Sequence, residues 1–183
     1  MKHAAPVRKD LGMRTILNIL GPLTNPAGAP NQVMGVFHPD LVGIQARVLK
    51  MLGSRHVLTV HGHDGLDEIT ITGPTHVAEL KHDFITEYTI EPKQFGLDVA
   101  PIDAIRVKDA AESRTRVESV LANEPGPSRD VVILNAAAAL YVCGVAGSLW
   151  DGVALARDAI ASGAARKKLE HLVAFTRGFA MAG

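Results

Sequence analysis

The fold is decided by Gln32-Val33-Met34-Gly35-Val36-Phe37 and Val57-Leu58-Thr59-Val60, two short apolar runs with a helix-like segment at 41–52 between them. Short runs of this composition are typical of buried strands, and the segment between them has helical periodicity. A strand, an amphipathic helix and a second strand in this order predict a βαβ unit, whose two strands are parallel. The sequence therefore predicts an α/β fold.

The helix between the two strands has recognisable start and stop signals. Asp40 precedes it and can cap its first turn, and Gly53 follows it, where a glycine commonly ends a helix. Its apolar residues recur at helical spacing and predict the face that packs on the sheet. The residues of this stripe are Leu41, Ile44, Val48 and Leu52.

Segments farther along the chain extend the sheet and add helices. The loose alternation at 75–81 and 83–90 predicts an antiparallel hairpin or edge pair. Helical patterns follow, and their ranges are 110–123, 128–142, 148–163 and 164–178. We therefore expect a mixed, largely parallel sheet flanked by helices, in one domain that spans residues 1–183.

The second of these helices is apolar nearly all round, which predicts a helix in the core. Asn135 lies within it and needs a partner if it is buried, so we expect it to tie a neighbouring loop rather than contact a ligand. Ser148 can cap the next helix, and Trp150 is expected in the core or at an interface. Cys143 lacks a basic neighbour and is expected to be a small buried side chain.

The segments near the amino terminus carry two further patterns. Residues 1–11 have the periodicity of a helix, but no capping residue precedes them. Such a helix can continue from an upstream segment or can fray at a natural terminus. Residues 21–30 contain three prolines and two glycines, which predict a loop.

The amino-acid composition and the charge balance limit which class of protein this can be. With 47% hydrophobic and 21% charged residues among 183, the chain can build a core. The 19 basic and 19 acidic residues balance, which gives no electrostatic reason to expect nucleic acid or an anionic membrane as a partner. No run reaches the roughly 18 apolar residues of a membrane span. A single cysteine favours a reducing compartment, so we expect a cytoplasmic protein.

The most informative loop is the stretch from His61 to Glu68, directly after the second strand. Ligands bind at the carboxyl ends of parallel strands, and the adjacent carboxylates of Asp67 and Glu68 suit Mg²⁺, which prefers oxygen ligands and bridges to phosphates. The alternative interpretation is an ordinary solvated acidic turn, because an Asp-Glu pair is a weak signal. Zinc is not expected, because no third nitrogen or sulfur ligand at suitable spacing joins His61 and His63.

Arg8 is the second candidate site residue. On a helix it would share a side with Ala4 and Ala5, whose small side chains leave room around its guanidinium. A guanidinium binds a carboxylate through two hydrogen bonds, so this position could hold an acidic ligand. The alternative, a solvated basic helix end, is the one that the residues by themselves favour.

Taken together, these segments resemble the anthranilate phosphoribosyltransferase family over essentially the whole chain. The motifs that carry the resemblance are VRKDLG at 7–12, RTILNILGPLTNP at 14–26, MGVF at 34–37, VHG at 60–62, GLDE at 65–68 and LNAA at 134–137. The resemblance implies a fold like that of nucleoside phosphorylases and phosphoribosyltransferases. It also implies transfer of a phosphoribosyl group from phosphoribosyl pyrophosphate to anthranilate, a step of tryptophan synthesis.

The same resemblance assigns roles to individual residues. Arg8 would bind the anthranilate carboxylate, and Asp67 and Glu68 would be ligands of the Mg²⁺ that accompanies phosphoribosyl pyrophosphate. The loop at 21–26 would line the route of the aromatic substrate. No catalytic nucleophile is implied, because the amino group of anthranilate is itself the nucleophile.

The family's chain is nearly twice as long, and the resemblance places this sequence in the carboxyl-terminal part of its α/β domain. Upstream segments of the family are missing, among them the small helical domain, the Gly-Thr-Gly-Gly-Asp turn for pyrophosphate and the Lys-His-Gly-Asn-Arg stretch. We therefore expect the isolated chain to be inactive and to self-associate through surfaces left uncovered. The parent enzyme is expected to be a homodimer.

Two relatives with other functions are alternatives to this interpretation. A non-catalytic, nucleic-acid-binding relative of the same fold would have a basic surface and would have lost the acidic pair, whereas here the charges balance and Asp67 and Glu68 are present. A pyrimidine nucleoside phosphorylase belongs to the same superfamily. The LGPLTNP loop at 20–26 together with Arg8 favours anthranilate instead.

Overall fold

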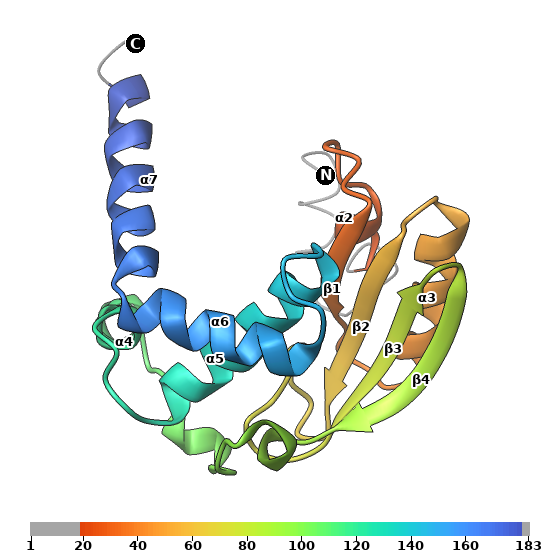
Figure 1. The fold of residues 1–183 in the computed structure, drawn as a ribbon, viewed down its shortest axis with the longest axis horizontal. Helices are drawn as coiled ribbons and strands as arrows, with labels where there is room; N and C mark the ends of the chain where they lie inside the picture. The colour runs from red at the N-terminus through yellow and green to blue at the C-terminus, as the bar shows by residue number, and fades with distance from the viewer. Residues whose placement is uncertain (1–18, 181–183) are drawn as a thin grey trace, which may run out of the picture.

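The computed structural model describes residues 19–180 and is built around one four-stranded sheet (Figure 1). Its strands lie side by side in chain order: β1 (Asn31–Gly35), β2 (His56–Gly62), β3 (Thr75–Lys81) and β4 (Phe84–Ile90). β1 and β2 are parallel, and β2–β3 and β3–β4 are antiparallel. The βαβ unit, the hairpin and the mixed sheet are confirmed.

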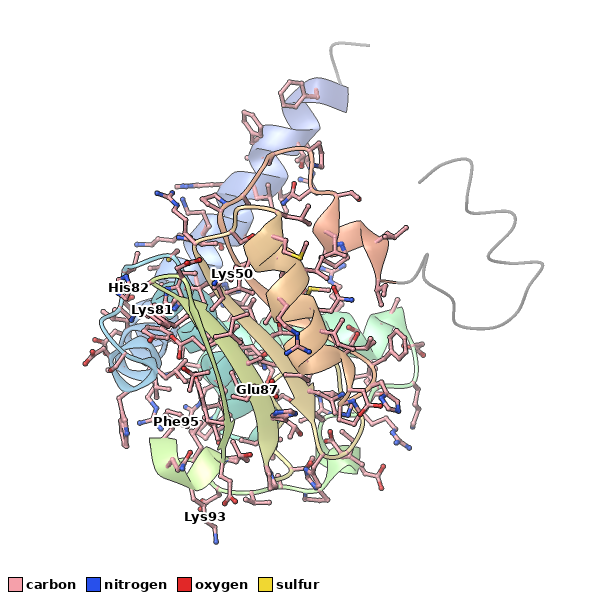
Figure 2. All side chains as sticks on the ribbon, turned by 90° about the vertical axis from the view of Figure 1, so that its right-hand side faces the viewer. Lys50, Lys81, His82, Glu87, Lys93 and Phe95 are labelled. Carbon is pink, nitrogen blue, oxygen red and sulfur yellow. The ribbon has the colours of Figure 1, made fainter. Side chains whose placement is uncertain are left out.

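The sheet differs from expectation in one respect, the proportion of its strand pairs that are parallel. Within the described residues only β1–β2 is parallel, so this part of the sheet is not largely parallel. The connection between β3 and β4 accounts for one of the two antiparallel pairs: His82 and Asp83 both have positive φ, at 49° and 68°. Such a two-residue turn joins antiparallel strands, whereas a parallel pair needs a long crossover. Lys50 lies beside this turn, and its Nζ donates to the Asp83 carbonyl at 2.6 Å (Figure 2).

Helix α3 (Leu41–Met51) covers one face of the sheet, but not with the predicted stripe. Val42, Ala46 and Leu49 are buried, whereas Ile44 and Leu52 are 45% and 60% exposed. The helix is apolar on both sides, and the sheet contacts the side that includes small residues. Gly43 on this side lies so close to Glu87 of β4 that a Cβ would overlap its carboxylate. Small residues let a helix approach a sheet closely, and the buried side of α3 carries Gly43 and Ala46.

The ends of α3 confirm one expectation and correct another. Gly53 has φ of +87° and follows the helix, as expected, and Ser54 donates from its backbone to the Leu49 carbonyl. Asp40 stands before the first residue, but its side chain makes no capping hydrogen bond. Its carboxylate lies 3.6 Å from the His38 ring instead.

Four longer helices follow close to the predicted ranges: α4 (Ala110–Leu121), α5 (Pro127–Val142), α6 (Leu149–Ala161) and α7 (Ala164–Ala180). Of these, α5 is the one that packs on the other face of the sheet. α5 is the core helix, with Ile133, Leu134 and Ala138 buried against the sheet and α6. α7 projects away from the rest of the molecule (Figure 1). Short 3₁₀ turns, η2 (Pro92–Phe95) and η3 (Ile102–Ala104), connect β4 to α4.

Three local expectations are tested by the remaining segments. Cys143 is exposed rather than buried, because it lies just past the end of α5, where the chain turns away from the core. Ser148 caps α6 as expected by accepting from the Asp151 amide, and Trp150 is 57% exposed with its ring 6.0 Å from Phe95.

The predicted loop at 21–30 begins inside a four-residue helix, α2 (Leu20–Leu23). Pro22 is accommodated because the first turn of a helix does not use its backbone N–H groups. Among residues 19–180, no helix is both long and apolar enough to cross a membrane. The predicted helix at 1–11 lies outside the described residues.

Candidate functional site

The loop that joins β2 to β3 lies against the carboxyl end of β1. A Cβ placed on Gly35, the last residue of β1, would overlap the carbonyl oxygen of Asp67. One residue on, the Val36 amide continues the parallel ladder by donating to the Val60 carbonyl at 3.0 Å. Asp67 therefore lies where the sequence predicted, at the carboxyl edge of the parallel pair.

Asp64 organises the turn that leads to the acidic pair. Its Oδ2 accepts from the hydroxyls of Thr70 and Thr72, both at 2.7 Å, and its Oδ1 accepts from the Leu66 amide at 3.1 Å. Burial, the largest influence, raises the pKa of Asp64, but the hydrogen bonds from Thr70, Thr72 and Leu66 together outweigh it and lower the pKa. Asp64 is thus an ionised carboxylate whose oxygens are already used within the loop.

Asp67 and Glu68 differ from Asp64 because, within residues 19–180, their carboxylates are unused. Both residues are exposed, and within residues 19–180 neither side chain accepts a hydrogen bond or forms an ion pair. Partial burial raises the pKa of Glu68, and the neighbouring charge of Asp67 raises it further. Two adjacent carboxylates that repel each other are stabilised by a shared cation, and Mg²⁺ is commonly held by one or two carboxylates with water and phosphate oxygens.

The histidines of the loop do not join these carboxylates. His61 is only 8% exposed, and its Nδ1 lies 2.7 Å from the Val36 carbonyl oxygen, so its ring turns inward and ties β2 to β1. His63 lies over Gly73, where an added Cβ would approach the ring to 2.7 Å. The described residues contain no group of three or more His, Cys, Asp and Glu side chains that could hold a metal. Asp67 and Glu68 therefore remain the candidate metal ligands that the sequence predicted, with no third such side chain grouped with them among the described residues.

Asn135 ties the loop from the opposite side, as expected. Its Oδ1 accepts from the Ile69 amide at 3.0 Å, and its Nδ2 donates to the Ile69 carbonyl at 2.8 Å. Nδ2 also donates to the Val131 carbonyl at 3.0 Å, one turn back on α5. The side chain contacts backbone groups of the residue that follows Glu68.

A groove of about 420 Å³ beside Glu68 has no counterpart in the predicted site. Its walls come from the loop, the segment before α4, α4 and α5, and three exposed apolar residues gather in it: Val107, Val117 and Val132. The sequence offered no signal for it, because residues far apart along the chain form it. Gly35 was also missed, although a glycine inside a predicted strand indicates a close backbone approach. Arg8, the predicted ligand of the anthranilate carboxylate, lies outside the described residues.

Comparisons with known proteins agree on one group of relatives. The model of the glycosyl transferase family, α/β domain, matches residues 1–166. Anthranilate phosphoribosyltransferase of Chromobacterium violaceum is 60% identical over 177 residues, which cover 97% of this chain and 52% of that protein. The enzyme of the same name from Laribacter hongkongensis is 58% identical over 180 residues, with 98% and 53% covered. The chain thus spans about half the length of these relatives.

Solved structures give the same result. Anthranilate phosphoribosyltransferase from Thermus thermophilus superposes with a TM-score of 0.87 at 43% identity, covering 97% of this chain and 52% of that one. The Saccharomyces cerevisiae enzyme in complex with phosphoribosyl pyrophosphate (PRPP) and Mg superposes with a TM-score of 0.82 at 29% identity, covering 93% and 50%.

Proposed function

Because the chain belongs to the glycosyl transferase family, whose α/β domain matches residues 1–166, we propose that it is the carboxyl-terminal part of an anthranilate phosphoribosyltransferase. The whole protein would join anthranilate to PRPP, giving N-(5-phosphoribosyl)anthranilate and pyrophosphate for tryptophan synthesis. The identity of about 60% to enzymes of that name supports this assignment over a nucleic-acid-binding relative. The single cysteine is consistent with a cytoplasmic enzyme.

The observation that carries the proposal is the pair of unused carboxylates at the carboxyl edge of β1 and β2. Asp67 and Glu68 would hold Mg²⁺, which when bound neutralises charge on the pyrophosphate leaving group. A relative of the same fold binds PRPP and Mg, which supports this role. Asp64 is less suited to it, because its oxygens already accept three hydrogen bonds.

The other residues of this chain would orient the acceptor rather than react. The amino group of anthranilate attacks C1 of the ribose, the C1–O bond to pyrophosphate breaks, and the nitrogen loses a proton. Arg8 would hold the anthranilate carboxylate through two hydrogen bonds and so aim the amino group. Fixing the orientation of a reacting group can lower a reaction barrier by several kcal/mol. An effect of this size is expected from binding of the anthranilate carboxylate by Arg8.

Activity would also require the part of the relatives that this chain does not span. We propose that this part completes the PRPP site and provides the homodimer contacts. The chain by itself is then expected to be inactive and to self-associate.

The test is a chimera that joins residues 1–183 to the segment of the Chromobacterium violaceum relative that they do not cover. Turnover of anthranilate with PRPP and Mg²⁺ is followed by anthranilate fluorescence. Asp67→Asn or Glu68→Gln should lower kcat at least about 10- to 100-fold, because losing a ligand should cost no less than losing a group that only orients one. Glu87→Gln is the matched control, because Glu87 is a partly exposed carboxylate on β4, outside the β2–β3 loop.

Two results would contradict the proposal. The first is turnover by the isolated 183-residue chain, which would make the missing segment dispensable. The second is a chimera whose activity is the same with and without the carboxylates of Asp67 and Glu68.

A further inference from the structure

The Asn135 side chain binds Ile69 in the way one peptide group binds another. The Ile69 N–H and C=O both pair with its amide, at 3.0 and 2.8 Å. The third bond, to the Val131 carbonyl at 3.0 Å, fixes the amide to its own helix. Asn135 therefore ties the backbone directly after Glu68 to α5, the core helix.

The backbone on the other side of the acidic pair is held as firmly. Asp67 lies on Gly35 so closely that no side chain fits there, and Gly62 donates to the Leu66 carbonyl at 2.8 Å. The acidic side chains add no hydrogen bond or ion pair of their own within residues 19–180. The backbone that carries both carboxylates is thus held between β1 on one side and Asn135 on the other.

We infer that Asn135 is a positioning residue of the metal site, which holds the backbone so that the Asp67 and Glu68 carboxylates face one divalent cation. This inference rests on the metal role proposed above. A cation that binds two adjacent side chains must order them, and a backbone that is already fixed removes part of that entropic cost. Groups that orient metal ligands typically change metal affinity 10- to 100-fold when removed.

The role of Asn135 is separable from the packing of its helix. α5 is held to the sheet by buried Leu134 and Ala138 and, near its carboxyl end, by Tyr141, whose hydroxyl donates to Glu79 of β3 at 2.7 Å. Asn135→Ala removes none of these contacts. The variant should keep α5 docked while it releases the segment that carries the acidic pair.

The experiment measures binding of Mn²⁺ alone to the full chain by NMR. Mn²⁺ broadens nearby amide signals, and the residues followed are 66–69. The wild type should lose these signals in a saturable way, and Glu68→Gln should abolish that response. Asn135→Ala should weaken the apparent affinity at least about tenfold. Val142→Ala is the control for a general loss of stability, because Val142 is buried at the far end of α5.

Asn135→Asp keeps the positioning role testable if the Asn135→Ala variant does not fold. It retains the acceptor for the Ile69 amide, but when ionised it loses both donors to carbonyl groups. Its added negative charge would by itself tighten Mn²⁺ binding, whereas loss of the clamp weakens it. Weaker binding in this variant therefore supports the positioning role, and tighter or unchanged binding overturns it.

The outcomes separate this inference from the proposed function. If the wild-type signals at 66–69 do not respond to Mn²⁺, the metal assignment fails and the inference fails with it. If Glu68→Gln abolishes the response but Asn135→Ala binds as tightly as the wild type, only the positioning role is overturned. Equal weakening in Asn135→Ala and Val142→Ala would overturn it too, because the effect would then be general destabilisation.

Discussion

Near the start of β2, the Glu79 carboxylate is surrounded by hydrogen-bond donors, whereas beyond the end of β2 the carboxylates of Asp67 and Glu68 have none among the described residues. Glu79 Oε1 lies 2.7 Å from the Tyr141 hydroxyl and 3.1 Å from His56 Nε2. Its Oε2 accepts from the Tyr88 hydroxyl at 2.9 Å.

The pKa values at the two ends move in opposite directions. Burial raises the pKa of Glu79 most, but the hydrogen bonds from Tyr141, Tyr88 and His56 together outweigh it, so the pKa is lowered. Burial and Asp67 raise the pKa of Glu68, with no hydrogen bond to oppose them. A carboxylate whose oxygens accept several hydrogen bonds, such as Glu79, thus serves the fold. A pair left unused at the carboxyl edge of β1 and β2 is available to a cation.

The largest effect on stability is expected at Gly35, which lies against the backbone of Asp67. Gly35→Ala would drive a methyl group into the Asp67 carbonyl, and because both sides of this contact are backbone, neither can rotate away. We expect a loss of about 3 kcal/mol in the free energy of unfolding, measured by urea denaturation. Gly178→Ala is the control, because open space surrounds Gly178 on α7, and it should be neutral or stabilising. A Gly35→Ala variant as stable as the wild type would contradict the close approach.

The second-largest effect on stability is expected at Glu79, whose carboxylate accepts hydrogen bonds from its neighbours. Glu79→Ala leaves Tyr141, Tyr88 and His56 without their shared acceptor, and unpaired groups of this kind cost about 1–3 kcal/mol each when they stay dry. We expect a loss of about 2 kcal/mol by urea denaturation, because some of the donors will reach water. Glu87→Ala on the neighbouring strand should change stability by less than about 1 kcal/mol, since its ion pairs are exposed. Equal losses of stability in Glu79→Ala and Glu87→Ala would contradict this prediction, because the hydrogen bonds of Glu79 would then contribute no more than the exposed ion pairs of Glu87.

The pH dependence of stability is expected to separate the two ends by sign. The pKa of Glu79 is lower in the folded state than its ordinary value of 4.5, so its contribution is present above that value and is lost as the pH falls through the folded pKa. The stability difference between wild type and Glu79→Ala should therefore shrink as the pH is lowered from about 7 to about 3. Urea titrations at several pH values measure it, and a difference that grows with acid would refute the assignment.

The smallest effect is expected at the unused pair. The pKa of Glu68 is raised, so the fold disfavours its charged form, and Glu68→Gln should leave stability at pH 7 unchanged or higher by up to about 0.5 kcal/mol. The gain should vanish as the pH falls below the ordinary value of 4.5, where the carboxyl group is protonated in both folded and unfolded states. Thermal unfolding of wild type and variant at both pH values checks this. A marked destabilisation would mean that Glu68 serves the fold after all.

Local signals in the sequence predicted most of the secondary structure. The strands β1 and β2, the glycine end of α3, the Ser148 cap and the four later helices followed from periodicity and turn chemistry. Asn135 was expected to bind a loop because a polar side chain in an apolar helix must find a partner. The acidic pair was placed at the end of a strand by its position after an apolar run.

Tertiary structure decided what spacing along the chain does not specify. Which apolar side of α3 is buried depended on packing against the sheet, and the buried side, with Gly43 and Ala46, is not the one that the stripe predicted. Which loop Asn135 binds, and that Gly35 lies beneath Asp67, depended on contacts between residues distant along the chain. Strands, helices and candidate ligands could be predicted from the sequence, because these depend on neighbours within a few residues. The arrangement of the backbone that carries the two carboxylates depended on the packing of β1 and α5 around the loop.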